Sequence, residues 1–151
     1  MSKNSICILL VALFAFSSGI FFSLLTPQLI ASIGAKPEVQ IATLADAIHC
    51  MHGDGVLIDA RERRYFDWGH IINAMNVPKG NFDSLSVEEW RTITACSNII
   101  VYCQGMDCGS AYFAAYKLEQ KGPKNIRVYE GGWNEWISCG MPTSGTGRLA
   151  Q

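Results

Sequence analysis

The chain has 151 residues, the length of a single domain, and carries 12 basic and 13 acidic residues. The net charge of −1 excludes the broad electrostatic attraction on which nucleic-acid binding depends. The apolar fraction of 49% is high and unevenly distributed, because no charged residue lies between Lys3 and Lys36. The N-terminal part of the chain therefore differs in kind from the remainder.

The charge-free segment contains an apolar run at residues 6–25, after a short flank at residues 1–5. At about 1.5 Å per residue this run would span about 30 Å, the thickness of the hydrocarbon core of a bilayer. We expect a transmembrane signal anchor, and a cleaved signal peptide is the alternative. The length of the run and the lack of a small-x-small site after it favour the anchor. Residues 26–38 then form a tether.

The charges that flank this run predict its orientation. Lys3 and the α-amino group precede the run, and Lys36 is the next charge after it. Positive charge before an anchor favours a cytoplasmic N-terminus. The rest of the chain is then expected in the periplasm or outside the cell, where disulfides persist. Cleavage of the run would instead release the domain into the periplasm.

Residues 39–146 have the pattern of one α/β domain, and residues 147–151 form a tail. Apolar residues recur at helical spacing at Ile41, Leu44, Ala45, Ile48 and Met51. Capping boxes are expected at Thr43 with Asp46 and at Ser86 with Glu89. Further helical segments are predicted at residues 61–68, 86–95, 110–120 and 133–138.

Short apolar runs between these helices predict buried strands at residues 56–60, 74–78, 98–102 and 126–129. Strands that alternate with helices indicate a parallel sheet of about five strands, flanked by helices on both faces. The ligand site of such a sheet lies at the carboxyl ends of its strands. Three polar features follow strand ends in this chain, namely Asp59 with Arg61, then Cys103, and finally Glu130.

Cys103 follows the strand residues Val101 and Tyr102 and precedes a loop that contains glycine and leads into a helix. Backbone N–H groups of such a loop and of a helix N-terminus favour the thiolate, which is the nucleophilic form of cysteine. The loop residues expected to surround a sulfur anion are Gln104, Gly105, Met106, Asp107 and Gly109. Cys103 is therefore the predicted nucleophile, in preference to a buried strand-end cysteine.

These features form part of a pattern that resembles the rhodanese homology domain over about residues 39–143. Asp59-Ala60-Arg61, followed by GHIINAMNVP at residues 69–78, is similar to the first signature of that family. GGWNEW at residues 131–136, followed by Gly140-Met141-Pro142, is similar to its closing signature. The resemblance implies a parallel sheet flanked by helices and a sulfur carrier in which Cys103 becomes a persulfide. We expect no cofactor and no metal ion.

The loop departs from this family pattern at two positions. Asp107 stands where many active rhodaneses have a basic residue. Because a carboxylate raises the pKa of a nearby thiol and repels a dianion, we expect thiosulfate to be a poor donor. The second departure, Cys108, has two interpretations. It is either a thiol that resolves the persulfide by forming a disulfide with Cys103, or a small apolar plug at the helix start.

Several other residues have structural interpretations. Asp59 and Arg61 are expected to form an internal pair that ties the strand edge to neighbouring loops, and support of the reactive loop is the alternative. Candidates for an apolar rim near the cysteine are Tyr65, Phe66 and Trp68. The remaining cysteines of the domain, Cys50, Cys96 and Cys139, are expected to be buried free thiols. His70 is expected to be a structural hydrogen-bonding residue, and His49 and His52 to be solvated.

The sequence thus predicts a membrane-anchored sulfurtransferase that accepts sulfane sulfur on Cys103 and passes it to a thiol. The expected partners are a small sulfane-sulfur donor, a thiol acceptor and the lipid bilayer, without nucleic acid. Two other functions stay open. One is a dithiol–disulfide redox protein that uses Cys103 and Cys108, and the other is a non-catalytic binding module.

Overall fold

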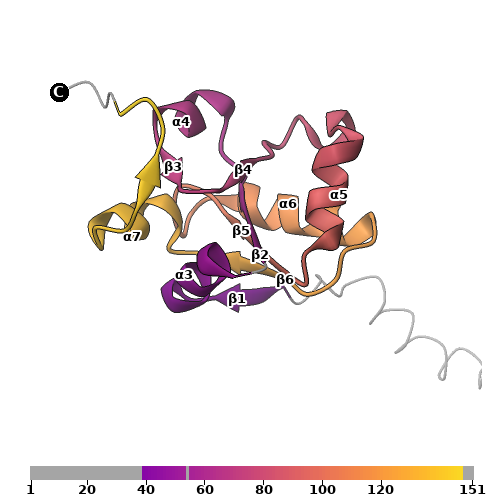
Figure 1. Ribbon diagram of the computed structural model, residues 1–151, viewed down its shortest axis with the longest axis horizontal. Helices are drawn as coiled ribbons and strands as arrows, with labels where there is room; N and C mark the ends of the chain where they lie inside the picture. Colours follow the sequence, from indigo (N-terminus) through magenta and orange to yellow (C-terminus); the bar gives the residue numbers. More distant parts are fainter. Residues whose placement is uncertain (1–38, 54, 148–151) are drawn as a thin grey trace, which may run out of the picture. The chain divides into compact units, whose positions relative to one another are not determined.

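A parallel sheet forms the centre of the domain. The computed structural model describes residues 39–53 and 55–147. Five strands run in the order β1-β6-β5-β2-β4, and all neighbouring pairs are parallel. They are β1 (Gln40–Ala42), β2 (Gly55–Asp59), β4 (Met75–Asn76), β5 (Asn98–Tyr102) and β6 (Ile126–Tyr129) (Figure 1). The predicted five-stranded parallel sheet is therefore confirmed.

Helices cover both faces of this sheet, as predicted (Figure 1). One face packs against α5 (Val87–Ala95) and α6 (Gly109–Gln120), and the other packs against α3 (Leu44–His52) and α7 (Gly132–Ser138). A short 3-10 helix, η1 (Phe82–Ser84), precedes α5. Each face of the sheet thus has its own apolar core.

The side chains of β5 alternate between these two cores, since successive residues of a strand point to opposite faces. Ile99 and Val101 lie in the core shared with α5 and α6, whereas Ile100 and Tyr102 lie in the core shared with α3 and α7. Cys103 continues the alternation into the α5–α6 core. The residue after the strand therefore faces α6.

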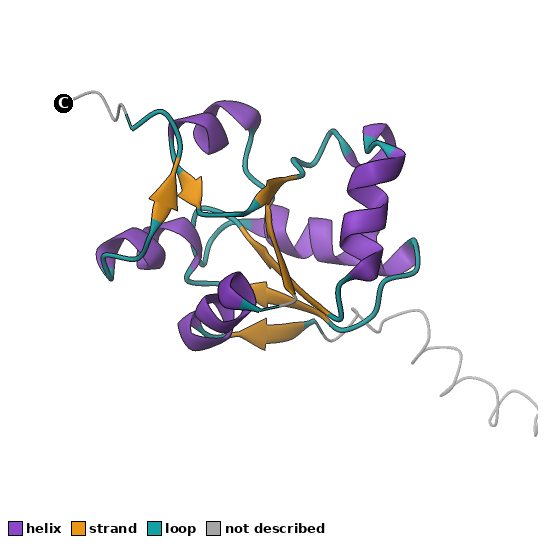
Figure 2. Ribbon diagram, viewed as in Figure 1, coloured by secondary structure: helices purple, strands orange, loops and turns teal. Residues whose placement is uncertain are grey.

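A second sheet, absent from the prediction, lies apart from the first (Figure 2). Its two strands, β3 (His70–Ile71) and β7 (Thr143–Ser144), pair in antiparallel fashion near α4 (Arg63–Trp68). Gly145 follows with φ +135°, and a Cβ at this position would lie 2.7 Å from the Cα of Gly69. Strands of two residues are too short to show an alternating pattern, so the sequence carries no signal for them.

Four expectations for single residues are wrong, and one of them is the burial of Cys96, which is only half-buried. Ile41 lies in β1 and not in the first helix, because this segment pairs with β6 at the edge of the sheet. Helix α4 begins at Arg63 rather than Arg61, whose backbone N–H and side chain are both bound to Asp59. Cys139 is exposed at the end of α7, because it is the capping residue that ends the helix.

Both predicted capping boxes are present. The N–H of Thr43 donates to the Asp46 carboxylate at 2.8 Å, and the N–H of Asp46 donates to the Thr43 hydroxyl at 3.2 Å. Ser86 and Glu89 make the same reciprocal pair at the start of α5. Asp46 also forms an ion pair with Arg127 of β6 at 2.8 Å. The hydrogen bonds from Thr43, followed by the contact with Arg127, hold the pKa of the Asp46 carboxyl well below its ordinary value.

Some predictions concern parts of the chain that the structure does not describe. The flank at residues 1–5, the hydrophobic helix at residues 6–25 and the tether at residues 26–38 lie outside the described residues, as does most of the tail at residues 147–151. Within residues 39–53 and 55–147, no helix is both long enough and apolar enough to cross a bilayer.

Asp46→Asn is expected to lower the free energy of unfolding by about 1 kcal/mol at neutral pH, because it removes a charged cap. The folded-state pKa of Asp46 lies below the unfolded value, so its stabilisation is complete above about pH 4 and is lost as the pH falls further. The difference between wild type and variant should therefore shrink below about pH 4. Urea titrations at stepped pH measure it, and a difference that does not vary with pH would contradict this explanation.

Candidate active site

The three polar features predicted at strand ends lie along one edge of the main sheet. Pairing in register places Asp59 beside Tyr102, and Tyr102 beside Tyr129. Cys103 and Glu130 are therefore the first residues after two neighbouring strands. This edge brings together an acidic residue, a cysteine and a second acidic residue from β2, β5 and β6.

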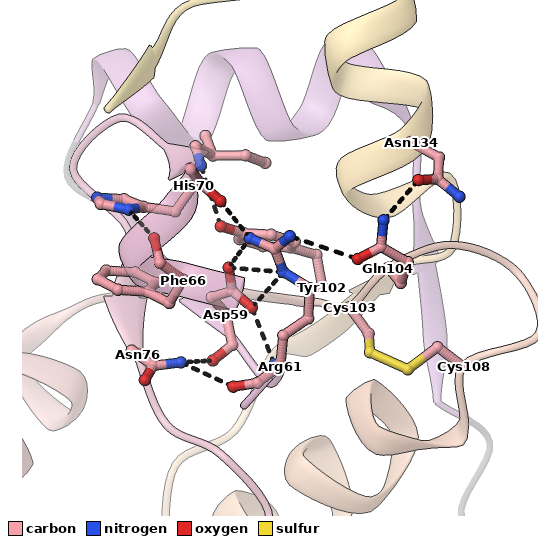
Figure 3. Close-up of polar contacts among 12 residues, drawn as sticks. Asp59, Arg61, Phe66, His70, Asn76, Tyr102, Cys103, Gln104, Cys108 and Asn134 are labelled. Atoms are coloured by element: carbon pink, nitrogen blue, oxygen red, sulfur yellow. Dashed lines mark hydrogen bonds and ion pairs between the residues drawn. A yellow bond between two sulfur atoms is a disulfide. The ribbon is translucent and has the colours of Figure 1, made fainter. Parts of the chain in front are cut away.

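A disulfide joins Cys103 to Cys108 across the loop between β5 and α6 (Figure 3). Their Cα atoms are 6.0 Å apart, which is an ordinary separation for this bond. Cys103 is 4% exposed, whereas Cys108, the residue that caps the start of α6, is only half-buried. The loop thus presents one protected sulfur and one more accessible sulfur.

The start of α7 fixes the position of this loop. The N–H groups of Trp133 and Asn134 donate to the carbonyl oxygens of Cys103 and Gln104, each at 2.9 Å. Gly132 allows this close approach, because its φ is +57° and a Cβ would lie 2.5 Å from the Cys103 oxygen. The predicted glycine pair after β6 therefore has a structural reason in the loop that carries the cysteine.

The remaining residues of the loop between β5 and α6 lie on its solvent-facing side. Met106, Asp107 and Gly109 are exposed, and Met106 is 76% exposed. The N–H of Cys108 donates to the carbonyl of Gly105 at 3.0 Å, which closes a tight turn. The N–H of Cys108 is one of the loop N–H groups expected near the sulfur anion. In the disulfide form it is therefore already hydrogen-bonded.

Asp59 and Arg61 form a buried ion pair beside the loop (Figure 3). Asp59 is 0% exposed and Arg61 is 5% exposed, and three nitrogen–oxygen distances between their side chains lie between 2.7 and 3.1 Å. Arg61 also donates to the carbonyl of Gly69 at 2.6 Å and to Oε1 of Gln104 at 3.4 Å. The pair thus ties the sheet edge to a neighbouring loop and also contacts the loop of Cys103.

Gln104 connects this ion pair to α7. Its Nε2 donates to Oδ1 of Asn134 at 2.7 Å, while its Oε1 accepts from Arg61. The Arg61 guanidinium lies 4.7 Å from the ring centroid of Trp133, within the range of a cation–π interaction. A carboxamide can accept and donate at once, so a glutamine suits this link. The sequence predicted Gln104 as a site residue because it directly follows Cys103.

Polar neighbours complete the surroundings of the ion pair. Asn76 donates to the carbonyl oxygens of Asp59 and Arg61, at 3.1 and 2.9 Å. The Tyr102 hydroxyl accepts from the N–H of Ile71 at 3.1 Å. Burial, followed by the nearby Asp59 carboxylate, raises the pKa of Tyr102 well above its ordinary value. Tyr102 therefore stays a neutral hydroxyl at the base of the site.

A cleft of about 600 Å³ opens beside Gln104. Its walls include Arg61, Tyr65, Trp68, Gln104, Trp133 and Ile137, whereas neither cysteine of the disulfide lines it. Arg61 is the one basic residue in the lining, and Asp59 neutralises it. The cleft therefore presents a mainly apolar surface, to which three aromatic side chains contribute, without an unpaired positive charge.

Two of the three aromatic residues predicted as a rim, Tyr65 and Trp68, line this cleft. Phe66 instead stacks on His70, with ring centroids 3.6 Å apart. His70 Nδ1 lies 2.8 Å from the Phe66 carbonyl oxygen, so the predicted structural role of this histidine is confirmed. His49 and His52 are exposed on α3. Among the described residues, no group of three or more His, Cys, Asp or Glu side chains could hold a metal ion.

Glu130 forms a second link between the sheet edge and α6. The hydroxyl of Tyr112 donates a hydrogen bond to the Glu130 carboxylate. This bond, followed by burial, raises the pKa of Tyr112 to about 12. Tyr112 was missed as a site residue, although it follows Cys108 by four positions and so shares its side of the helix.

A comparison with known proteins agrees with this arrangement. The sequence profile of the rhodanese-like domain matches residues 42–139, which include β2, the disulfide loop and α7. The chain belongs to the rhodanese-like domain family. The match also explains why the signature residues after β2 and at α7 meet at a single sheet edge.

Two solved structures share the fold of this rhodanese-like domain, and one further protein is similar to it in sequence. A Bacillus halodurans protein of known structure superposes with a TM-score of 0.61 at 23% identity, over 80% of this chain and 88% of that one. A rhodanese-related protein from Thermoplasma volcanium has a TM-score of 0.55 at 25% identity, over 70% and 97%. An uncharacterized protein of Buchnera aphidicola subsp. Baizongia pistaciae is 30% identical over 107 residues, which are 69% of this chain and 71% of that protein.

Gly132→Ala is expected to lower the free energy of unfolding of the rhodanese-like domain by more than about 2 kcal/mol. An alanine would be strained at φ +57°, and its Cβ would overlap the Cys103 carbonyl oxygen. Gly80→Ala is the matched control, because a Cβ there would meet nothing within 4 Å. Urea denaturation measures both variants, and equal stabilities would contradict the role assigned to Gly132.

Proposed function

We propose that this protein is a sulfurtransferase that carries sulfur as a persulfide on Cys103. The place of Cys103 supports this most directly, since it follows the central strand of a rhodanese-like domain and begins the loop to α6. In the reduced protein, the Cys103 thiolate attacks the outer sulfur of a donor R–S–SH. The S–S bond of the donor breaks, R–S⁻ leaves, and Cys103–S–SH forms.

The charges around the loop favour a donor of low charge. Residues 104–109 contain no Lys or Arg, and Asp107 is exposed among them. The guanidinium of Arg61 is bound by Asp59, so it has little charge to offer a second anion. We therefore propose a polysulfide or a protein persulfide as the donor and expect thiosulfate to react poorly. The acceptor is a thiol, for which the cleft beside Gln104 offers an uncharged surface.

Cys108 has a resolving role in this proposal. The disulfide supports this role, because it requires the two sulfurs to come within bonding distance. The Cys108 sulfur attacks Sγ of Cys103, the bond to the outer sulfur breaks, and HS⁻ leaves. In balance, Cys103–S–SH and Cys108–SH give the disulfide and H₂S, so the sulfane sulfur is reduced and two thiols are oxidised.

A dithiol reductant is needed to restore the two thiols. Because Cys108 is more exposed than Cys103, the incoming thiolate reaches the Cys108 sulfur more readily. Cys103 then leaves as a thiolate, the form that accepts the next sulfur. The second thiol of the reductant releases Cys108 and forms the disulfide of the reductant. The same exchange without sulfur transfer is the second candidate function, which the disulfide also favours.

Mass spectrometry of the reduced protein tests these functions. In the peptide that contains residues 103 and 108, polysulfide should add one sulfur atom in Cys108→Ser and none in Cys103→Ser, because Cys103 is the thiol of the pair that accepts sulfur; the exposed Cys139 lies outside this peptide. Wild type should instead release H₂S and lose two hydrogen atoms as the disulfide forms. Thiosulfate should give much less of either product than polysulfide at equal concentration.

Cys103→Ser and Cys108→Ser control for each other, since each variant keeps one of the two loop thiols. Loss of two hydrogen atoms in wild type without sulfur gain in Cys108→Ser would favour the redox protein. No mass change in any sample would favour a non-catalytic binding module. Either result would contradict the proposed sulfurtransferase.

The proposed location is a membrane, with the domain in the periplasm and residues 6–25 as a single-pass anchor. Cell fractionation should find the full-length chain in the membrane fraction. A reporter fused after Gln151 should be active only outside the cytoplasm. A shortened protein released from membranes would indicate a cleaved signal peptide, and a cytoplasmic reporter would contradict the orientation.

A further inference from the structure

Glu130 is the first residue after β6, as Cys103 is the first residue after the neighbouring strand β5. Tyr102 pairs with Tyr129 at the end of the β5–β6 register, so Cys103 and Glu130 leave the sheet from adjacent positions at the same edge. Neighbouring strands are about 4.8 Å apart. Both side chains face α6, because Cys103 lies in the α5–α6 core and Glu130 binds Tyr112. A carboxylate thus stands beside the reactive cysteine on the same face of the sheet.

The first turn of α6 completes this arrangement. Cys108 caps the helix and Tyr112 follows four residues later, a spacing that places two side chains on one side of a helix. Both pack against the same core that contains Cys103. Two bonds of different kinds therefore connect the sheet edge to the first turn of α6. One is the Cys103–Cys108 disulfide, and the other is the hydrogen bond from Tyr112 to Glu130.

The proposed resolving step needs a proton acceptor for Cys108. An unperturbed thiol has a pKa of about 8.5, so most of it is protonated at neutral pH and only the thiolate attacks a persulfide. Tyr112 does not accept this proton, since its phenol already donates to Glu130. Glu130 is partly exposed, and Tyr112 is the single side chain in the described structure seen to donate to its carboxylate.

The other charged groups on neighbouring elements are less suited to this role. Asp107 is exposed in the loop, and Glu135 of α7 interacts with Tyr129, whose side chain lies in the opposite core. Two further carboxylates are already neutralised by arginines, in the pairs Asp59–Arg61 and Asp46–Arg127. Lys117 of α6 lies over the ring of Phe113. Glu130 is therefore the carboxylate placed on the side of the two cysteines.

We propose that Glu130, held by Tyr112, accepts the proton of the Cys108 thiol as that thiol attacks the persulfide on Cys103. This inference rests on the sulfurtransferase function proposed above. The new bond joins Sγ of Cys108 to Sγ of Cys103, and the bond from Cys103 to the outer sulfur breaks. HS⁻ leaves with the electron pair, and the proton on Glu130 passes to solvent. When a dithiol reduces the disulfide, the second thiol of the reductant loses a proton as it attacks, and Glu130 passes a proton to the Cys108 thiolate that leaves.

The test follows the resolving step in a single turnover. Reduced full-length wild type and Glu130→Gln are mixed with polysulfide, quenched at intervals and analysed for persulfide and disulfide by mass spectrometry. The wild-type rate of disulfide formation should change little between about pH 6 and 8, because a neighbouring carboxylate removes the proton as the thiol attacks and no prior ionisation of the thiol is needed. In Glu130→Gln it should be about a hundredfold lower near pH 6 and rise about tenfold per pH unit as the thiol ionises by itself.

Glu135→Gln is the matched control, because it removes another carboxylate at the same sheet edge and should keep the wild-type profile. Tyr112→Phe should give an intermediate rate, since the carboxylate loses the bond that positions it. A rate in Glu130→Gln that is lowered equally at every pH would overturn the proposal in favour of a structural role. An unchanged pH profile in Glu130→Gln would overturn it as well.

Sulfur loading separates this proposal from the function on which it rests. The addition of sulfur to Cys103 is measured in Cys108→Ser, with and without Glu130→Gln, and should be alike in both. If no sulfur is added in Cys108→Ser, the sulfurtransferase function itself fails. If sulfur is added but wild type forms no disulfide, Cys108 does not resolve the persulfide. The role proposed for Glu130 is then contradicted, whereas sulfur transfer to Cys103 is still supported.

Discussion

The buried ion pair between Asp59 and Arg61 is the constraint around which the sheet edge is organised. Removing two charges from water costs several kcal/mol for each ion, and this cost is offset only when the remaining donors and acceptors are also satisfied. The Arg61 guanidinium accordingly binds Asp59, the Gly69 carbonyl and Gln104 at once. Breaking one of these contacts would leave a charge or a polar group buried without its partner, so the end of β2, the start of β3 and the distant loop of Cys103 are held together.

Because Asp59 neutralises Arg61, the site lacks an arginine that could bind an anionic donor. A free arginine beside the cysteine would attract an anionic donor, but Arg61 is turned toward Asp59 and stacked near Trp133. The cleft at this place is therefore mainly apolar rather than cationic. A buried pair that stabilises the fold and a cation that binds substrate are competing uses of the same guanidinium.

The alternation of side chains along β5 divides the site into two sides. Tyr102 points toward the core shared with α3 and α7, where its hydroxyl meets Ile71. Cys103 points toward α6, where it meets Cys108. The cleft and the disulfide consequently lie near one loop without sharing their lining, and Gln104 lies between them as a residue of the loop that also lines the cleft. The neutral cleft and the sulfur chemistry can therefore be altered separately.

Local patterns in the sequence were sufficient for the helices, the parallel sheet and the cysteine after β5. Capping boxes and apolar runs are set by residues near one another, so they can be recognised without the fold. The two-residue strands β3 and β7 and the edge strand that contains Ile41 could not be recognised, because pairing with distant residues makes them strands. The link from Tyr112 to Glu130 could not be recognised either. The pairing of Asp59 with Arg61 was predicted, but its full set of contacts was not, and the bond between Cys103 and Cys108 was one of two interpretations that the sequence left open. Each depends on distances between side chains, and only the packed tertiary structure decides those distances.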